Sequence, residues 1–214
     1  MVIDLSHTIS SKTPVYPGDA ETVITRVKTY ESDGYTISTL FGSPHTGTHM
    51  DMPSHMTGDK SMVPDFPAGL FVVKGVLLDV KDSDIIDFNP LWGDAIHEGC
   101  AVLLYTGWSD YYGQVRYFSA HPVVCERFAD LLAKKKIRIL GIDAPSPDRA
   151  PHGVHKKLMS SGVFILENLT NLDRLLGARD FTLIAPPVKL DAEGAPVRAV
   201  ALIEPRAQSR DRKL

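Results

Sequence analysis

The sequence predicts an α/β fold with a mixed, barrel-like β core and few helices. Short apolar runs rich in β-branched residues recur along the 214 residues, as expected for strands. Proline and glycine are spread through the whole chain, which indicates many short elements joined by turns. No linker divides the chain, so we expect a single domain over residues 1–214, with residues 207–214 as a mobile polar tail.

Eight segments are expected to form strands: 22–29, 35–41, 71–80, 101–106, 137–142, 163–166, 181–185 and 197–203. One convincing helix is expected to open at His121-Pro122. Its apolar face would consist of side chains at helical spacing, namely Val124, Phe128, Leu131 and Leu132. The three lysines at 134–136 suit its C-terminal end, where the helix dipole favours cations, better than a phosphate-binding patch. A second, weaker helix is expected over residues 154–160.

Charge and composition argue against several classes of function. The net charge is −3 and the isoelectric point is near 6.2, whereas a protein that binds nucleic acid through its phosphates is normally basic. No apolar run is long enough to cross a bilayer, and the N-terminus lacks the features of a secretory signal. The two cysteines, Cys100 and Cys125, form no CxxC motif and suggest a reducing compartment. We therefore expect a cytoplasmic protein without nucleic-acid or membrane partners.

The most informative segment is residues 45–55, which hold three histidines and one aspartate. On a straight strand, His45 and His49 would lie about 13 Å apart, too far to share one ion. On a straight helix, His49 and Asp51 would lie about 200° apart around the axis. A compact turn at Gly47, followed by an extended step from His49 to Asp51, would bring all three side chains together. The segment therefore predicts a metal site, and the alternative is a surface loop that happens to be rich in histidine.

Imidazole and carboxylate are suitable ligands for Zn²⁺, Mn²⁺ and related ions. A carboxylate can also bridge two ions, which allows a dinuclear centre. Further ligands would come from His152, His155 or Glu167. Glu167 follows an apolar run and is expected at the end of a buried strand, where a carboxylate is costly unless it is paired or bound to metal. The alternative places Glu167 at a strand end that faces solvent, and a single histidine in a loop is more often a surface residue than a ligand.

Residues 45–55 read HTGTHMDMPSH and resemble the HxGTHxDxPxH signature of the cyclase-like metal-dependent hydrolases, a family that includes bacterial kynurenine formamidase and isatin hydrolase. The resemblance extends along most of the chain. The further matching segments, in order, are residues 4–6 (DLS), 14–19 (PVYPGD), 140–146 (LGIDAPS), 162–169 (GVFILENL), 186–190 (PPVKL) and 195–199 (APVRA). Within residues 162–169, Asn168 stands where glycine is common.

The resemblance implies a swivelling β/β/α fold and a homodimer or homotetramer. It also implies two divalent ions per subunit, with zinc and manganese equally suited to the ligands. His45, His49 and Asp51 would bind the first ion and Asp51 would bridge to the second. His155, twelve residues before Glu167, would bind the second ion, and Glu167 would contact both. No role is implied for His152.

The implied activity is hydrolysis of the C–N bond of a small-molecule amide. We expect an arylformamidase that converts N-formylkynurenine to kynurenine and formate in tryptophan catabolism. A bound ion would lower the pKa of water from about 16 towards about 7, so that hydroxide attacks at neutral pH. His55 would take a proton from this water and pass it to the leaving nitrogen. Alternatively, His55 is a further ligand or a hydrogen-bond donor to one.

Tyr16 occupies the position that is typically tryptophan in kynurenine formamidase, where this aromatic residue contacts the substrate. Tyrosine can still stack on an aryl ring, but it is smaller, and the alternative is an aromatic that caps the core. Phe41, Phe66 and Trp108 are further candidates for the pocket, although packing in the core suits each of them better. The competing functions are hydrolysis of another cyclic amide or lactone, as in isatin hydrolase, and metal binding without catalysis. The cluster contains no cysteine and has a spare histidine, which favours an enzyme over a closed structural site.

Overall fold

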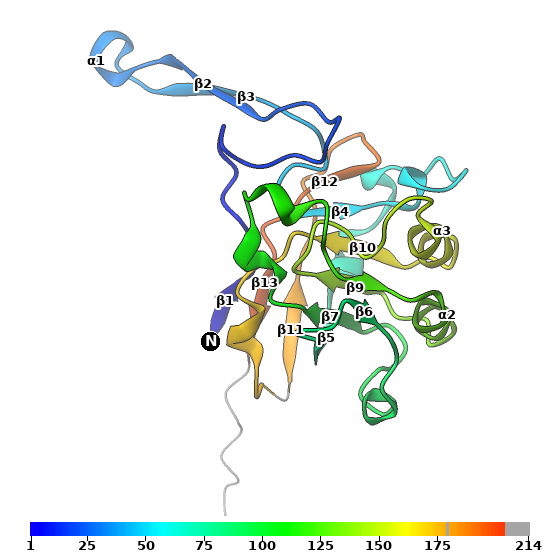
Figure 1. Ribbon diagram of the computed structural model, residues 1–214. Helices are drawn as coiled ribbons and strands as arrows, with labels where there is room; N and C mark the ends of the chain where they lie inside the picture. The colour runs from blue at the N-terminus through cyan, green and yellow to red at the C-terminus, as the bar shows by residue number, and fades with distance from the viewer. Residues whose placement is uncertain (179, 204–214) are drawn as a thin grey trace, which may run out of the picture.

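The computed structural model describes residues 1–178 and 180–203 of the chain. Its centre is a nine-stranded sheet with the strand order β1-β13-β11-β5-β7-β9-β10-β4-β12 (Figure 1). Two further pairs, β2 with β3 and β6 with β8, lie outside this sheet. The mixed sheet and the few helices confirm the predicted fold class. The predicted mobile tail, residues 207–214, lies outside the described residues.

The strands are β1 (Val2–Asp4), β2 (Val23–Lys28), β3 (Ile37–Phe41), β4 (His49–Asp51), β5 (Val72–Asp79), β6 (Ile85–Ile86), β7 (Ala101–Tyr105), β8 (Val123–Val124), β9 (Ile139–Ile142), β10 (Phe164–Glu167), β11 (Phe181–Ile184), β12 (Gly194–Pro196) and β13 (Val200–Leu202). The α-helices are α1 (Tyr30–Asp33), α2 (Glu126–Lys134) and α3 (Gly153–Ser160). Each of the eight predicted strand segments overlaps a strand, and α3 confirms the weaker predicted helix. The strands that were not predicted are β1, β4, β6, β8 and β12, which have at most three residues each.

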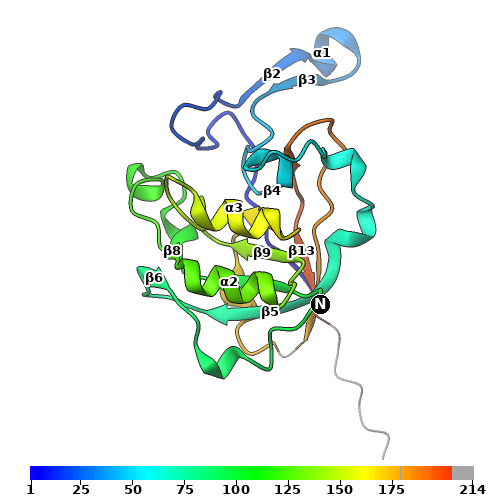
Figure 2. The same cartoon turned by 90° about the vertical axis from the view of Figure 1, so that its right-hand side faces the viewer.

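The parallel strands β5, β7, β9 and β10 form the middle of the sheet. Every residue of β7 and β9 is buried, as expected for parallel strands that are covered on both faces. Helices α2 and α3 lie side by side against one face (Figure 2). Alternate residues of β7 belong to different apolar clusters. Leu104 is in the cluster that includes Phe128 of α2, and Leu103 is in the cluster that includes Phe181 of β11. The core therefore has two layers, one on each face of the sheet.

The predicted start of the main helix is wrong. The helix begins at Glu126, directly after Cys125, and not at His121-Pro122. Val124, which was assigned to the apolar face of the helix, lies in β8 and pairs with Ile86 of β6. Valine favours extended backbone, and the pairing with β6 holds residues 123–124 in that conformation, so the helix begins only after them. The predicted end of the helix at the lysine run is confirmed by the last helical residue, Lys134.

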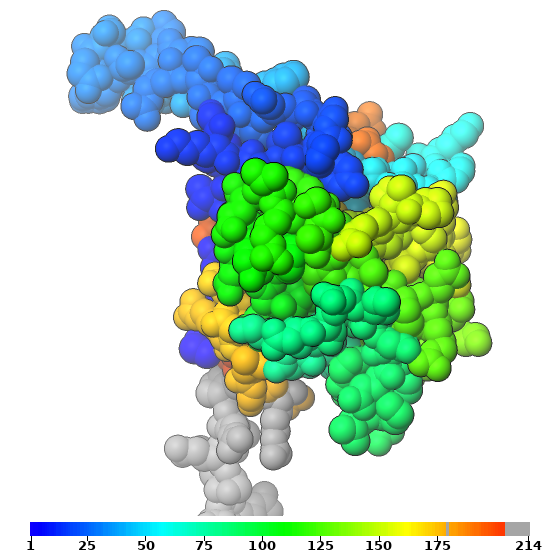
Figure 3. Space-filling view, in the orientation of Figure 1, coloured from blue at the N-terminus to red at the C-terminus, as the bar shows by residue number. Residues whose placement is uncertain are grey.

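Strands β2 and β3 form a hairpin, with α1 at its tip, that stands away from the rest of the molecule (Figures 1 and 3). We refer to residues 23–41 as the arm. Many of its apolar side chains are exposed, namely those of Val23, Ile24, Val27, Tyr30, Tyr35, Ile37, Leu40 and Phe41. An isolated two-stranded hairpin is at best marginally stable in water, and these exposed side chains leave much of the arm's apolar surface uncovered. Phe41, one of the candidate pocket residues, is in this arm and is 65% exposed.

Candidate metal centre

The turn that precedes β4 has the predicted form. Gly47 adopts a left-handed conformation, with φ of +65°, which glycine tolerates without a steric penalty. The chain then extends as β4, from His49 to Asp51. The carbonyl oxygen of Gly47 lies 2.9 Å from Nδ1 of His49, so the turn also orients the first ring that follows it. The predicted compact turn and extended step are confirmed.

The register between β4 and β10 brings a distant carboxylate to this segment. His49 lies directly opposite Glu167 on the antiparallel neighbour β10. Side chains alternate along a strand, so His49 and Asp51 point to the same face of the sheet. Glu167 ends a fully buried strand, as predicted, and its own side chain is buried. The alternative that placed Glu167 in solvent is therefore wrong.

The five predicted metal ligands lie together at one end of the sheet. Oδ1 of Asp51 is 2.8 Å from Nδ1 of His45 and 3.4 Å from Nε2 of His49. The other oxygen of Asp51, Oδ2, is 3.8 Å from Nε2 of His155. The two oxygens of Glu167 are likewise divided, with Oε2 3.4 Å from Nε2 of His49 and Oε1 3.2 Å from Nε2 of His155. Each carboxylate thus lies between His49 and His155.

The charges of the cluster fit a bound cation. Burial disfavours a charged His49, yet the Asp51 and Glu167 carboxylates outweigh this effect and raise the pKa of His49 to about 10. Burial likewise opposes ionisation of Asp51, but His49, His155 and His45 hold its pKa well below the usual value. Two buried carboxylates therefore require positive charge between them. A divalent cation supplies that charge, and imidazole and carboxylate are suitable ligands for it, so the donor set fits a metal site.

Each of the three imidazoles has a second partner on its other ring nitrogen. Nδ1 of His155 lies 2.6 Å from Oδ1 of Asp148, and Nε2 of His45 lies 3.2 Å from Oε1 of Glu193. Such contacts fix the tautomer and orientation of a ligating ring. Burial opposes the charge on Asp148, but hydrogen bonds from His155 and His152 hold its pKa at about 2, so it stays ionised.

Neither Asp148 nor Glu193 was predicted from the sequence. Asp148 had a usable signal, since it precedes a candidate ligand, His155, by seven residues and is the only acidic residue between Asp143 and Glu167. Glu193 had none, because 148 residues separate it from His45. His152, for which the family resemblance implied no role, also hydrogen-bonds Asp148, at 3.0 Å.

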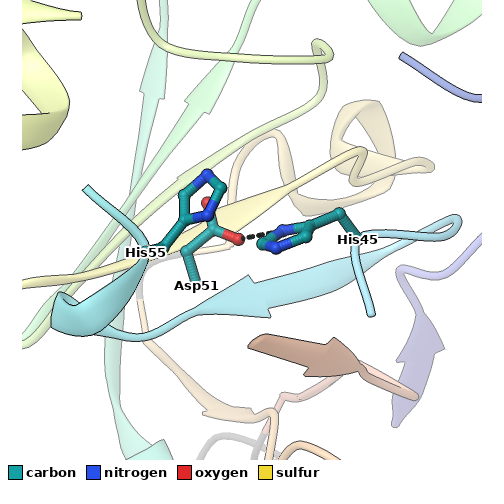
Figure 4. Close-up of side chains that lie close together, drawn as sticks. All are labelled: His45, Asp51 and His55. Atoms are coloured by element: carbon teal, nitrogen blue, oxygen red, sulfur yellow. Dashed lines mark hydrogen bonds and ion pairs between the residues drawn. The ribbon is translucent and has the colours of Figure 1, made fainter. Parts of the chain in front are cut away.

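His55 differs from the other histidines of the cluster. Its ring centroid lies 4.2 Å from that of His45 and 6.4 Å from that of His155. Figure 4 shows the rings of His45 and His55 close to the Asp51 carboxylate. Among the described residues, the His55 ring has no hydrogen-bond partner. Burial lowers the pKa of His55, which favours the neutral ring that can accept a proton.

A cavity of about 400 Å³ opens over the cluster. Its wall includes His55 and His152 together with Tyr16, whose ring meets Phe118 edge-on at 5.7 Å. Tyr16 is 42% exposed, so it is at the rim of the cavity and does not cap the core. Phe66 and Trp108, the other candidate pocket residues, do not line this cavity and pack against the two apolar clusters instead.

Asn168 connects the turn at Gly47 to the aromatic residues behind the site. It adopts a left-handed conformation, with φ of 55°, which asparagine tolerates better than most residues other than glycine. Its Nδ2 donates to the Gly47 carbonyl at 3.0 Å, and its Oδ1 accepts from the hydroxyl of Tyr117 at 2.8 Å. Asparagine at a position where glycine is common in the family therefore keeps the backbone conformation and adds a brace to the turn.

Gly194 gives a test of how closely His45 must be held. A Cβ atom at this position would lie 2.9 Å from Cε1 of His45 and 3.1 Å from the Met50 carbonyl oxygen. We expect Gly194→Ala to displace the His45 ring and to weaken metal affinity by about tenfold, the lower end of effects seen when ligand-orienting contacts are lost. Competition with a chromogenic chelator measures this affinity. Gly58→Ala is the matched control, because no atom lies within 4 Å of a Cβ built there, and unchanged affinity in Gly194→Ala would contradict the prediction.

Three kinds of comparison with known proteins give matches to this chain. A family model described as "Putative cyclase" matches residues 3–149. The protein named kynurenine formamidase of Bacillus cytotoxicus is 32% identical over 203 residues, which cover 92% of this chain and 95% of that protein. Isatin hydrolase A from Labrenzia aggregata superposes with a TM-score of 0.83 at 26% identity and covers 95% of this chain and 94% of its own. A solved structure described as a predicted metal-dependent hydrolase from Bacillus stearothermophilus is 30% identical, with a TM-score of 0.76, and covers 95% and 98% of the two chains.

These similarities extend over nearly the whole chain in both sequence and structure. They confirm the family resemblance that residues 45–55 indicated, and they rule against metal binding without catalysis, since the relatives carry the names of hydrolases. This chain belongs to the cyclase family and is a hydrolytic enzyme of that family.

Proposed function

We propose that this protein is a metal-dependent amidohydrolase, and specifically an arylformamidase that converts N-formylkynurenine to kynurenine and formate in tryptophan catabolism. The observation that carries the proposal is the buried group of three imidazoles and two carboxylates at the floor of a 400 Å³ cavity, with a further imidazole, His55, beside it. Relatives named kynurenine formamidase, at about 32% identity, support the substrate. The same reaction type also suits a cyclic amide, and the structural similarity to isatin hydrolase A favours isatin as the second substrate to test.

The ligand set divides into two groups that share Asp51. We assign His45, His49 and Asp51 to a first divalent ion, because Oδ1 of Asp51 faces both rings. We assign Asp51, His155 and Glu167 to a second ion, because Oδ2 of Asp51 and Oε1 of Glu167 face the His155 ring. The nitrogen and oxygen donors suit zinc and manganese. The position of Asp51 between the two groups, with one oxygen facing each, supports two ions per subunit.

The bound metal would lower the pKa of water and polarise the substrate carbonyl. The chain itself supplies the proton transfer. His55 lines the cavity, and its ring has no hydrogen-bond partner among the described residues. It can therefore accept a proton from the attacking water. It then donates this proton to the nitrogen that leaves as the amine. This second transfer matters because an anilide nitrogen is a poor leaving group until it is protonated.

Tyr16 at the rim of the cavity would stack on the aryl group of the substrate. Its ring is fixed edge-on by Phe118, which leaves a ring face available to a planar ligand. The smaller ring, compared with tryptophan, reduces the stacked area. This difference supports testing more than one aryl amide.

Removal of the metal tests the proposed function directly. Elemental analysis of the purified protein is expected to find zinc or manganese, and a chelator is expected to abolish hydrolysis of N-formylkynurenine. Adding Zn²⁺ or Mn²⁺ back is expected to restore it, because the proposed ligand atoms lie within a few ångströms of one another. Assays of isatin in parallel decide between the two substrates. Full activity in protein whose metal has been removed would contradict the scheme.

We propose that the protein is a homodimer or a homotetramer in which the arm of one subunit packs against a second copy of this chain. Both faces of the arm carry exposed apolar side chains, and Ile24 pairs with Leu40 across it. We expect Leu40→Glu to shift the protein towards the monomer in light scattering coupled to size-exclusion chromatography. Leu91→Glu is the control, since Leu91 is 88% exposed outside the arm. A wild-type protein that is monomeric at micromolar concentration would refute the proposal.

We also propose that the protein is cytoplasmic. The described residues contain two free cysteines, Cys100 and Cys125, as a reducing compartment allows. No helix among these residues combines the length and apolar character needed to cross a membrane.

A further inference from the structure

Asp148 holds two histidines, of which the family resemblance accounts for only one. Its Oδ1 lies 2.6 Å from Nδ1 of His155 and 3.0 Å from Nδ1 of His152, and its Oδ2 accepts from the backbone N–H of His155 at 3.0 Å. A carboxylate only accepts hydrogen bonds, so both Nδ1 atoms are donors. In the neutral rings, the proton is then on Nδ1, and both Nε2 atoms carry a lone pair.

The two Nε2 atoms serve different surroundings. That of His155 faces Glu167 and Asp51 in the proposed metal site. The His152 ring lies 5.7 Å from the His155 ring, nearly perpendicular to it, and forms part of the cavity wall. Its side chain is 25% exposed, and among the described residues Nε2 of His152 has no partner. The outer nitrogen of His152 is thus an oriented hydrogen-bond acceptor at the edge of the reaction site.

The backbone fixes His152 as firmly as its side chain does. The residue adopts a left-handed conformation, with φ of 61° and ψ of 47°, immediately before α3. Its N–H donates to the Arg149 carbonyl at 2.9 Å, and its carbonyl accepts from the N–H of Lys156 at 3.2 Å. A non-glycine residue in this conformation is uncommon and persists only where its surroundings hold it. Position, ring orientation and tautomer of His152 are therefore all determined before a substrate binds.

We propose that Nε2 of His152 accepts a hydrogen bond from the N–H of the amide that is cleaved, so that the enzyme selects secondary amides over N-substituted ones. This inference rests on the proposed amidohydrolase function. Both candidate substrates fit it, because the anilide of N-formylkynurenine and the ring amide of isatin each carry an N–H on the bond that breaks. His152 is a substrate-contacting residue in this scheme, and proton transfer remains with His55.

The test compares formanilide, which has an amide N–H, with N-methylformanilide, which has none. We use His152→Gly as the main variant, because glycine adopts the left-handed conformation without strain. His152→Asn is the second variant, since asparagine also tolerates this conformation and can donate to Asp148 but has no Nε2. His97→Ala is the control, because His97 is exposed and does not line the cavity.

We expect His152→Gly and His152→Asn to lower kcat/KM for formanilide by about tenfold, mainly through KM, as for the loss of one hydrogen bond. The rate on N-methylformanilide is expected to change little, so the preference for the secondary amide falls by the same factor. Metal content and affinity, measured by chelator competition, are expected to match the wild type.

Three results would overturn this role. They are an equal loss on both amides, no loss on formanilide, and a loss of metal affinity that accounts for the change in rate. The proposed function fails separately, if the metal-loaded wild-type protein hydrolyses neither amide nor N-formylkynurenine, and the role of His152 fails with it. Activity of the wild type with an unchanged preference in both variants refutes the role of His152 alone.

Discussion

Replacing Asp51 with alanine is expected to remove bound metal and, with it, all measurable hydrolysis. The carboxylate is buried, and its two oxygens face three different imidazoles, so no neighbouring side chain can take its place. Without it, both proposed ligand groups lose a member at once. Elemental analysis after dialysis gives the metal content, and thermal unfolding gives a second readout that does not depend on activity.

The thermal readout has a calculable size. Metal at about 100 times its Kd stabilises a folded protein by about 2.7 kcal/mol. For a chain of this length, that energy raises Tm by roughly 5–10 °C. We expect this rise in the wild type and none in Asp51→Ala.

The matched control is Asp59→Ala, which removes an exposed carboxylate in a turn away from the cavity. This variant should bind metal and gain Tm as the wild type does. An Asp51→Ala protein that retains a full complement of metal would refute the assignment of Asp51 as the shared ligand. Such a result would mean that His155 and Glu167 bind metal without the Asp51 oxygen that faces His155 from β4.

Replacing His55 with alanine is expected to have the opposite pattern: metal is retained and turnover is lost. His55 has no hydrogen bond to the proposed ligands among the described residues, so its removal leaves their positions intact. General acid–base catalysis by a positioned side chain typically contributes 10²-fold or more, and we expect kcat to fall by about that factor. Single-turnover rates on N-formylkynurenine, with metal content measured on the same sample, test both parts.

His97→Ala serves as the control for a histidine outside the cavity. If His55→Ala retains full activity, His55 is excluded from proton transfer. If it loses metal in proportion to activity, His55 is a ligand, which was the alternative open at the level of sequence. This second outcome is a real alternative, because the side chains of His55, His45 and Asp51 lie close enough together to hold an ion.

The helix prediction shows where local pattern fails. The apolar spacing correctly predicted α2 through Phe128 and Leu132, both buried, but placed its start before β8. Val123 and Val124 are compatible with either a helix or a strand in a short window. Their pairing with β6, a segment far away in sequence, decided for the strand. The short strands β4 and β12 escaped prediction for the same reason, since three residues hold too little periodicity to identify a strand.

The ligand segment, in contrast, was predictable because its shape depends on residues within it. Gly47 allows the turn, and the proline after Met52 favours extended backbone before it, so His45, His49 and Asp51 converge by local geometry. The signature in residues 45–55 added the family, and the family implied His155 and Glu167. Asp148 and Glu193, which orient these ligands, could not be predicted in this way, because they are not part of the segment.

The chain alone was sufficient to predict its fold class, its family and the side chains that we propose as metal ligands, because each depends on periodicity or on a short segment whose conformation is set locally. Only the folded molecule decided that Glu167 faces His49, that Asp148 orients two histidines and that Glu193 reaches His45 across 148 residues. The physical reason is that strand register and packing bring these groups together, and contacts between segments so far apart leave no periodic trace in the order of the residues.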